Sequence, residues 1–135
     1  MSPTPTPESV VLATYTAFWK ALPEASRLSG APRTAVLAQY LVNPALSKIS
    51  GTLAAQDAFH KGLYGQVVLR PLNVSASGTR AEVRDCQDTS DSGVVDLKTG
   101  NKVTKGIPRT LVITTLVYAG DAWRIATIDY QGPKC

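Results

Sequence analysis

The sequence predicts one α+β domain, with N-terminal helices packed on a mostly antiparallel β-sheet. Apolar residues recur every three or four positions in the first half of the chain and alternate with polar residues from residue 64 onward. These two periods are typical of helices and of half-buried strands. Short turns join the later segments, which favours antiparallel pairing, and helices followed by such a sheet form the α+β arrangement. A chain of 135 residues can bury a core as one domain.

Three helices are expected before residue 64. The first follows Thr6, a capping residue, and Pro23 should end or kink it. A second helix covers about 33–42, and Asn43 caps a third that ends near Gly62. The apolar face of the first helix consists of Val11, Tyr15, Phe18, Trp19 and Leu22.

The second half reads as a series of strands separated by turn residues. Thr99-Gly100-Asn101 predicts one hairpin and Gly120-Asp121 another. The expected strands are 65–76, 79–88, 93–97, 102–106, 109–119 and 121–130.

Alternation along two of these strands suggests a cavity between the helices and the sheet. In 79–88, Asp85 and Gln87 continue the apolar face of Ala81 and Val83. In 121–130, strict alternation puts Trp123 and Asp129 on one face. The candidate pocket residues are therefore Tyr15, Trp19, Asp85, Gln87, Trp123 and Asp129. Alternatively, the two aspartates lie at the solvated rim of the sheet and the aromatic residues simply fill the core.

The chain has two cysteines, Cys86 in a predicted strand and Cys135 at the last position. A disulfide between them would fasten the last strand and would close a loop of about 50 residues. Disulfides persist outside the cytosol, so this pairing predicts an extracytoplasmic protein. The alternative is two unrelated thiols in a cytosolic protein.

Several classes of function are disfavoured by what the sequence lacks. The net charge of +4 is spread along the chain, whereas a nucleic-acid-binding protein usually gathers its basic residues on one face. The sequence has no CxxC pair, no phosphate-binding loop and no nucleophile motif. We therefore expect no metal, no cofactor, no nucleic-acid partner and no assigned catalytic residue.

Residues 1–7, MSPTPTP, form a Pro/Thr-rich tether, and residues 8–135 form the domain. Five segments resemble a group of small actinobacterial secreted proteins and lipoproteins: YTAFWKAL (15–22), LVNPALSKIS (41–50), LYGQVVLRP (63–71), AEVRDCQDTS (81–90) and TGNKV (99–103). Over about residues 8–131 the pattern is similar to the nuclear transport factor 2-like (cystatin-like cone) superfamily. The resemblance implies a curved, cone-like sheet, export, the Cys86–Cys135 bridge, and anchoring through a lipidated cysteine that this chain lacks. It also allows a gene carried by a phage or another mobile element.

We accordingly expect a non-enzymatic, extracytoplasmic binding module, the soluble part of a secreted protein or envelope lipoprotein. Its partner would be a small apolar ligand or a protein, and it would be a monomer or a homodimer through the sheet face. Membrane contact would come only through the N-terminal anchor. The alternative is an isomerase, dehydratase or cyclase using Asp85 and Tyr15, because the superfamily's enzymes place a tyrosine on the first helix and acids inside the cone.

Overall fold

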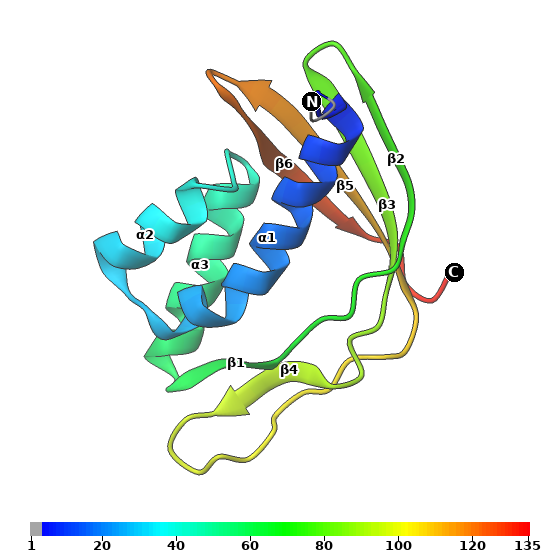
Figure 1. Ribbon diagram of the computed structural model, residues 1–135. Coiled ribbons are helices and arrows are strands. Elements are labelled where there is room, and N and C mark those ends of the chain that lie inside the picture. Colours follow the sequence, from blue (N-terminus) through cyan, green and yellow to red (C-terminus); the bar gives the residue numbers. More distant parts are fainter. Residues whose placement is uncertain (1–3) are drawn as a thin grey trace.

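The computed structural model, which describes residues 4–135, confirms the α+β class. In Figure 1 the helices lie together against one face of a long curved sheet, and β1 and β4 lie beyond one end of it. The elements are α1 (Pro7–Arg27), α2 (Gly30–Ala38), α3 (Ala45–Ala58), β1 (Lys61–Gly65), β2 (Pro71–Ser77), β3 (Arg80–Gln87), β4 (Ser92–Asp96), β5 (Thr110–Ala119) and β6 (Ala122–Tyr130).

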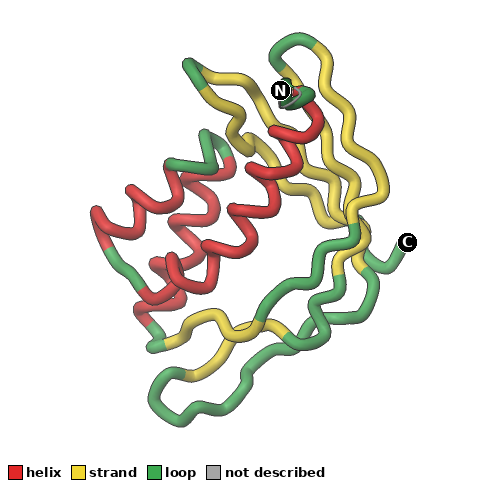
Figure 2. The backbone as a smooth tube through the Cα atoms, in the orientation of Figure 1, coloured by secondary structure: helices red, strands yellow, loops and turns green. Residues whose placement is uncertain are grey.

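The strands form two antiparallel sheets. The main sheet has the order β2-β3-β5-β6, and β1 pairs with β4 in a second, two-stranded sheet. The two long connections, residues 66–70 and 97–109, lie at the same end of the molecule as this smaller sheet (Figure 2). Part of the predicted tether falls on residues 1–3, outside the described residues, and Pro7 is already the first residue of α1.

The helices are fastened to the sheet by side chains and by backbone. The buried face of α1, which includes Val11 and Phe18, packs against Leu116 and Ile125 on the inner face of the sheet. At β6, the Ile125 amide donates to the Tyr40 carbonyl at 2.7 Å, and the Val42 amide donates to the Ile125 carbonyl at 2.9 Å. This attachment fixes the distance between the helix layer and the strands.

Pro23 was predicted to end or kink the first helix. It does not end the helix, which continues to Arg27. The Ser26 hydroxyl donates to the Pro23 carbonyl at 2.8 Å. Arg33, which is almost fully buried, donates to the carbonyl of Ala25 at 3.0 Å and to that of Ser26 at 3.1 Å. These bonds satisfy carbonyl groups of the last turn, so the turn persists after the proline.

The predicted strand at 102–106 is wrong. In addition, β1 begins at Lys61, within the expected end of the third helix and before the first predicted strand at 65–76. The hairpin turn does form, as the single antiparallel bridge between Val95 and Lys102 shows. Beyond it, the Val94 amide donates to the Thr104 hydroxyl at 2.8 Å instead of to a carbonyl. A side chain thus takes the place of one ladder bond, and the contact continues only irregularly. The Val103 and Thr104 amides both donate to the Val94 carbonyl, at 2.7 and 3.2 Å, and the Gly106 amide donates to the Ser92 carbonyl at 3.1 Å.

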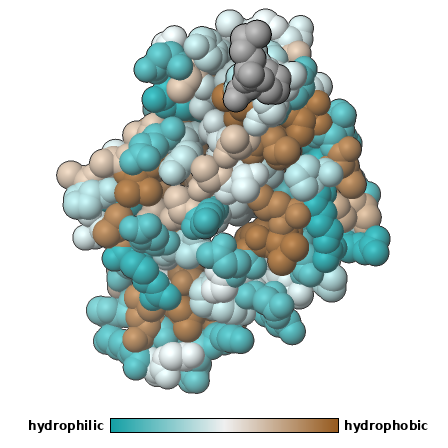
Figure 3. Space-filling view, viewed as in Figure 1, coloured by the Kyte–Doolittle hydropathy of each residue, from teal (hydrophilic) through white to brown (hydrophobic). Residues whose placement is uncertain are grey.

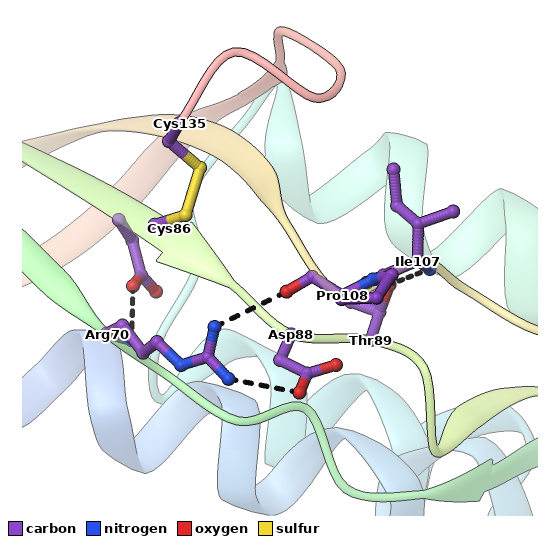
Figure 4. Close-up of a disulfide and its surroundings, with 8 residues drawn as sticks. Arg70, Cys86, Asp88, Thr89, Ile107, Pro108 and Cys135 are labelled. Atoms are coloured by element: carbon purple, nitrogen blue, oxygen red, sulfur yellow. Dashed lines mark hydrogen bonds and ion pairs between the residues drawn. A yellow bond between two sulfur atoms is a disulfide. The ribbon is translucent and has the colours of Figure 1, made fainter.

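The predicted disulfide is confirmed. Cys86 on β3 and Cys135 at the chain end are bonded, with Cα atoms 5.8 Å apart (Figure 4). Cys86 lies between Asp85 and Gln87, which face the helices, so its side chain lies on the opposite face of the sheet. No helix within residues 4–135 is long and apolar enough to cross a membrane.

Candidate functional site

A buried polar network connects α1 to the inner face of β3. The Tyr15 hydroxyl donates to Oδ2 of Asp85 at 2.5 Å, and Nε2 of Gln87 donates to the Tyr15 hydroxyl at 3.0 Å. The other oxygen of Asp85, Oδ1, accepts the backbone N–H of Arg70 at 2.6 Å. All three side chains of the network are fully buried. Helical spacing on α1 and alternation on β3 bring them together as the sequence suggested.

The network keeps Tyr15 protonated. Burial raises the pKa of its hydroxyl well above the ordinary value, and the hydrogen bond to Asp85 raises it further. The single hydroxyl proton therefore stays on the bond to Asp85. With that proton committed, the Tyr15 oxygen can only accept from Gln87.

The raised pKa of Tyr15 predicts a loss of stability at high pH. Above about pH 10 the unfolded chain ionises Tyr15 while the folded chain does not, so the unfolded state binds fewer protons and the free energy of unfolding falls. Below that pH both states hold the proton and the contribution is constant. Urea unfolding at about pH 9 and about pH 11 should show an additional loss of about 1.4 kcal/mol in the natural protein compared with Tyr15→Phe. Equal losses in both proteins would contradict the assignment.

A pocket of about 200 Å³ lies next to this network, between α1 and the strands β1, β3 and β4. We call it the α1 pocket. Its walls are mostly apolar, and no residue with a charged side chain lines it within the described part of the chain. The lining residues are Trp19, Leu22, Pro23, Leu63, Tyr64, Gly65, Val67, Gln87, Thr89, Ser92, Gly93 and Tyr130.

Two buried polar atoms of residues that line the α1 pocket have no hydrogen-bond partner among residues 4–135. They are Nε1 of Trp19, a donor, and Oε1 of Gln87, an acceptor. Gln87 is fully buried and Trp19 is 6% exposed, so bulk water does not readily supply the missing bonds. Buried polar groups without partners are uncommon in native proteins, and they often mark the position of a ligand or an ordered water.

The connection between β1 and β2 forms one wall of the α1 pocket through Val67. Arg70 anchors this connection to the strand side, since its guanidinium donates to Asp88 at 3.1 Å and to the Pro108 carbonyl at 3.4 Å (Figure 4). Hydrogen bonds from Ser90, followed by the charge and hydrogen bond of Arg70, hold the pKa of Asp88 below its usual range. The wall is thereby tied to the same residue, Arg70, whose backbone N–H bonds to Asp85.

A second, more open hollow of about 520 Å³ shares Trp19 and Val67 with the α1 pocket. Its other lining residues come from α1 and from residues 66–69: Thr16, Lys20, Gln66 and Leu69. The face of the molecule in Figure 3 is hollowed near its centre, with a hydrophobic area beside the hollow. The shared residues show that this hollow adjoins the α1 pocket at Trp19 and Val67.

Asp129 does not lie with the other candidates, so its assignment to the inner face is corrected. Thr115 pairs with Thr127 but Leu116 pairs with Ile125, so Ala126 forms a bulge in β6. A one-residue bulge reverses the faces of all later residues. Asp129 is therefore exposed and accepts a hydrogen bond from Gln131 at 2.7 Å.

The same bulge brings Tyr130 to the α1 pocket, a residue that alternation had placed elsewhere. Trp123 precedes the bulge and is buried in the core beside Tyr118, with ring centroids 5.4 Å apart, and it is not among the residues lining the α1 pocket. Leu63, Tyr64 and Val67 also line the pocket but were not candidates. No signal in the sequence marks them, because their position depends on β1 pairing with a distant strand.

Comparisons with known proteins identify the fold only. No family model matches the chain, and no curated protein matches its sequence. The intermembrane-space region of the chloroplast protein ARC6 has a similar structure, with a TM-score of 0.71, 14% identity, and coverage of 96% of this chain and 99% of that one. A solution structure of a de novo β-sheet design aligns over 93% of this chain and 91% of that one, with a TM-score of 0.46 and 12% identity.

Proposed function

We propose that this protein is a non-enzymatic binding module that holds a small, largely apolar ligand in the α1 pocket. The observation that carries this proposal is a pocket with apolar walls and two buried polar atoms that have no partner among the described residues. Ligand sites are typically of this kind, with mostly apolar lining and a few polar groups that set orientation. The geometry therefore favours a small ligand over a protein partner on the sheet face.

The size of the pocket limits the ligand. An apolar cavity of about 150 Å³ can take up benzene, so a pocket of about 200 Å³ suits a single substituted ring or a short branched chain. The more open hollow beside Trp19 gives room for a longer tail to extend outward. A large polar substrate does not fit these dimensions and this lining.

The disulfide supports an extracytoplasmic location, which is part of the proposal. A bond between Cys86 and Cys135 persists in an oxidising compartment and is rare in the cytosol. Membership of the nuclear transport factor 2-like superfamily, as a secreted or envelope-anchored protein, is proposed with it. Three helices against one face of a curved antiparallel sheet support that membership.

The enzymatic alternative depends on Asp85 and Tyr15, and their contacts favour a structural role. Each oxygen of Asp85 already accepts a hydrogen bond, and Asp85 does not line the α1 pocket. The raised pKa of Tyr15 makes its hydroxyl a poor proton donor to a substrate. A general acid or base must reach the proton that it transfers, and these two groups face each other instead.

Filling the pocket is the direct test. Val67→Phe places a ring in the α1 pocket, whereas Val68→Phe makes the same change at a neighbouring residue that is 48% exposed and does not line the pocket. With toluene as the probe, we expect a saturable shift of the Trp19 indole N–H resonance in the natural protein and in Val68→Phe. Affinity should fall at least about tenfold in Val67→Phe, a change of about 1.4 kcal/mol.

The Trp123 indole N–H serves as an internal control, because Trp123 is buried elsewhere in the core. The absence of saturable binding of any small aromatic probe, toluene and its polar analogues alike, to the natural protein would overturn the proposal. Equal binding by Val67→Phe and the natural protein would place the ligand outside the α1 pocket and would also overturn it.

A further inference from the structure

We infer that the ligand of the α1 pocket is uncharged and presents an acceptor to Trp19 and a donor to Gln87, as a hydroxyl group does. This inference rests on the proposed function and specifies the chemistry of the ligand. It starts from two unpartnered atoms, Nε1 of Trp19 and Oε1 of Gln87, whose residues line the same pocket. One can only donate and the other can only accept.

The orientation of the Gln87 amide is set by the network behind it. The Tyr15 proton is used on Asp85, so the Tyr15 oxygen is an acceptor and must face the NH₂ group of Gln87. The reverse orientation would set the Gln87 oxygen against an oxygen that has no proton to share. Asp85 and Tyr15 are thus positioning residues, which act through Gln87 to present an acceptor at the pocket.

Three of the four hydroxyl groups in the lining are already engaged, and the fourth belongs to Tyr130, which is 60% exposed and can bond to water. The Tyr64 hydroxyl donates to the Thr104 carbonyl at 2.9 Å. The Ser92 hydroxyl donates to the Thr89 carbonyl at 3.1 Å, and the Thr89 hydroxyl donates to the Ile107 carbonyl at 3.2 Å. The Trp19 and Gln87 atoms are therefore the buried pair, among the described residues, that a ligand in this pocket would complete.

The lining excludes charged ligands. A carboxylate would face the Gln87 oxygen with no cationic side chain in the lining, and an ammonium group would face the Trp19 N–H with no anionic side chain in the lining. A charge buried without a partner is strongly unfavourable. A hydroxyl group reproduces both of the bonds that a water molecule would make here, so it can displace that water without leaving either atom unpaired.

Three probes of similar size test the inference: phenol, toluene and benzoate. Phenol can accept from Trp19 and donate to Gln87, toluene can do neither, and benzoate adds a charge. In the natural protein we expect phenol to bind at least about tenfold more tightly than toluene, and benzoate to bind at least about tenfold more weakly than phenol. The Trp19 indole N–H resonance should move downfield with phenol, as a new hydrogen bond requires, while that of Trp123 stays in place.

Matched variants assign the preference to the two atoms. Gln87→Met and Trp19→Phe each remove one polar atom, so they should reduce the preference for phenol while toluene still binds. Tyr64→Phe also removes a polar atom from the lining, but one that is bonded to the Thr104 carbonyl, so the preference should remain. For Trp19→Phe, the backbone amides of Leu63 and Val67 replace the indole signal as reporters.

The outcomes separate this inference from the proposed function. If toluene binds as tightly as phenol, the inference is overturned and the binding function stands. If phenol is preferred equally in the natural protein and in both variants, its hydroxyl bonds elsewhere and the inference is again overturned. If none of the probes binds, the proposed function fails as well. The comparison of probes in the natural protein decides the matter even if a variant does not fold.

Discussion

Reduction of the bond between Cys86 and Cys135 is expected to lower the free energy of unfolding by about 4 kcal/mol. The bond joins residues 49 positions apart, and a cross-link of this span restricts the unfolded chain strongly. A typical domain is stable by only about 5–15 kcal/mol, so the loss is a large share of the total. Urea unfolding with and without reductant measures it.

The double variant Cys86→Ala/Cys135→Ala is the control for reductant effects, since it should unfold at the same urea concentration under both conditions. Without the bond, the tail retains two backbone contacts with β5. The Leu111 amide donates to the Gly132 carbonyl at 2.9 Å, and the Gln131 amide donates to the Leu111 carbonyl at 2.8 Å. Faster hydrogen exchange at these amides should accompany reduction. A reduced protein as stable as the oxidised one would show that these contacts suffice.

The site could be predicted from the sequence where strands are regular. From Arg80 to Gln87, each residue of β3 pairs with β5 without interruption. Side chains therefore alternate strictly, and the assignment of Asp85 and Gln87 to the inner face was correct. Helical spacing placed Tyr15 opposite them for the same reason, since both periods are properties of the backbone.

The sequence did not reveal the features that depend on distant contacts. The bulge at Ala126 reversed the faces of Asp129 and Tyr130, and no glycine or proline marks that position. The segment Lys61–Gly65 becomes a strand only because it pairs with Ser92–Asp96. Local patterns carry no information about such pairings, so one wall of the α1 pocket was missed.

Asp85→Ala is expected to lower the free energy of unfolding by about 3–5 kcal/mol. The change removes the acceptor of the Tyr15 hydroxyl and of the Arg70 amide at a fully buried position. Each buried donor left without a partner costs about 1–3 kcal/mol, and the lost side-chain volume adds to this. Urea unfolding at neutral pH measures the difference from the natural protein.

Two variants make this test specific. Asp129→Ala removes the same side chain from an exposed position, so it should change stability by no more than about 0.5 kcal/mol. Asp85→Asn keeps the shape but replaces one accepting oxygen with an NH₂ group, so one of the two donors loses its partner and the loss should be intermediate. Because Tyr15 and Asp85 are in contact, Tyr15→Phe combined with Asp85→Ala should cost less than the sum of the single changes.

The same variant separates the two views of this network. If Asp85 serves to hold Tyr15 and thereby Gln87, then Asp85→Ala frees the Gln87 amide to rotate, and the preference for phenol over toluene should fall together with stability. If Asp85→Ala were no less stable than Asp129→Ala, the carboxylate would not be required to hold these groups. Its burial beside a protonated tyrosine would then need another explanation.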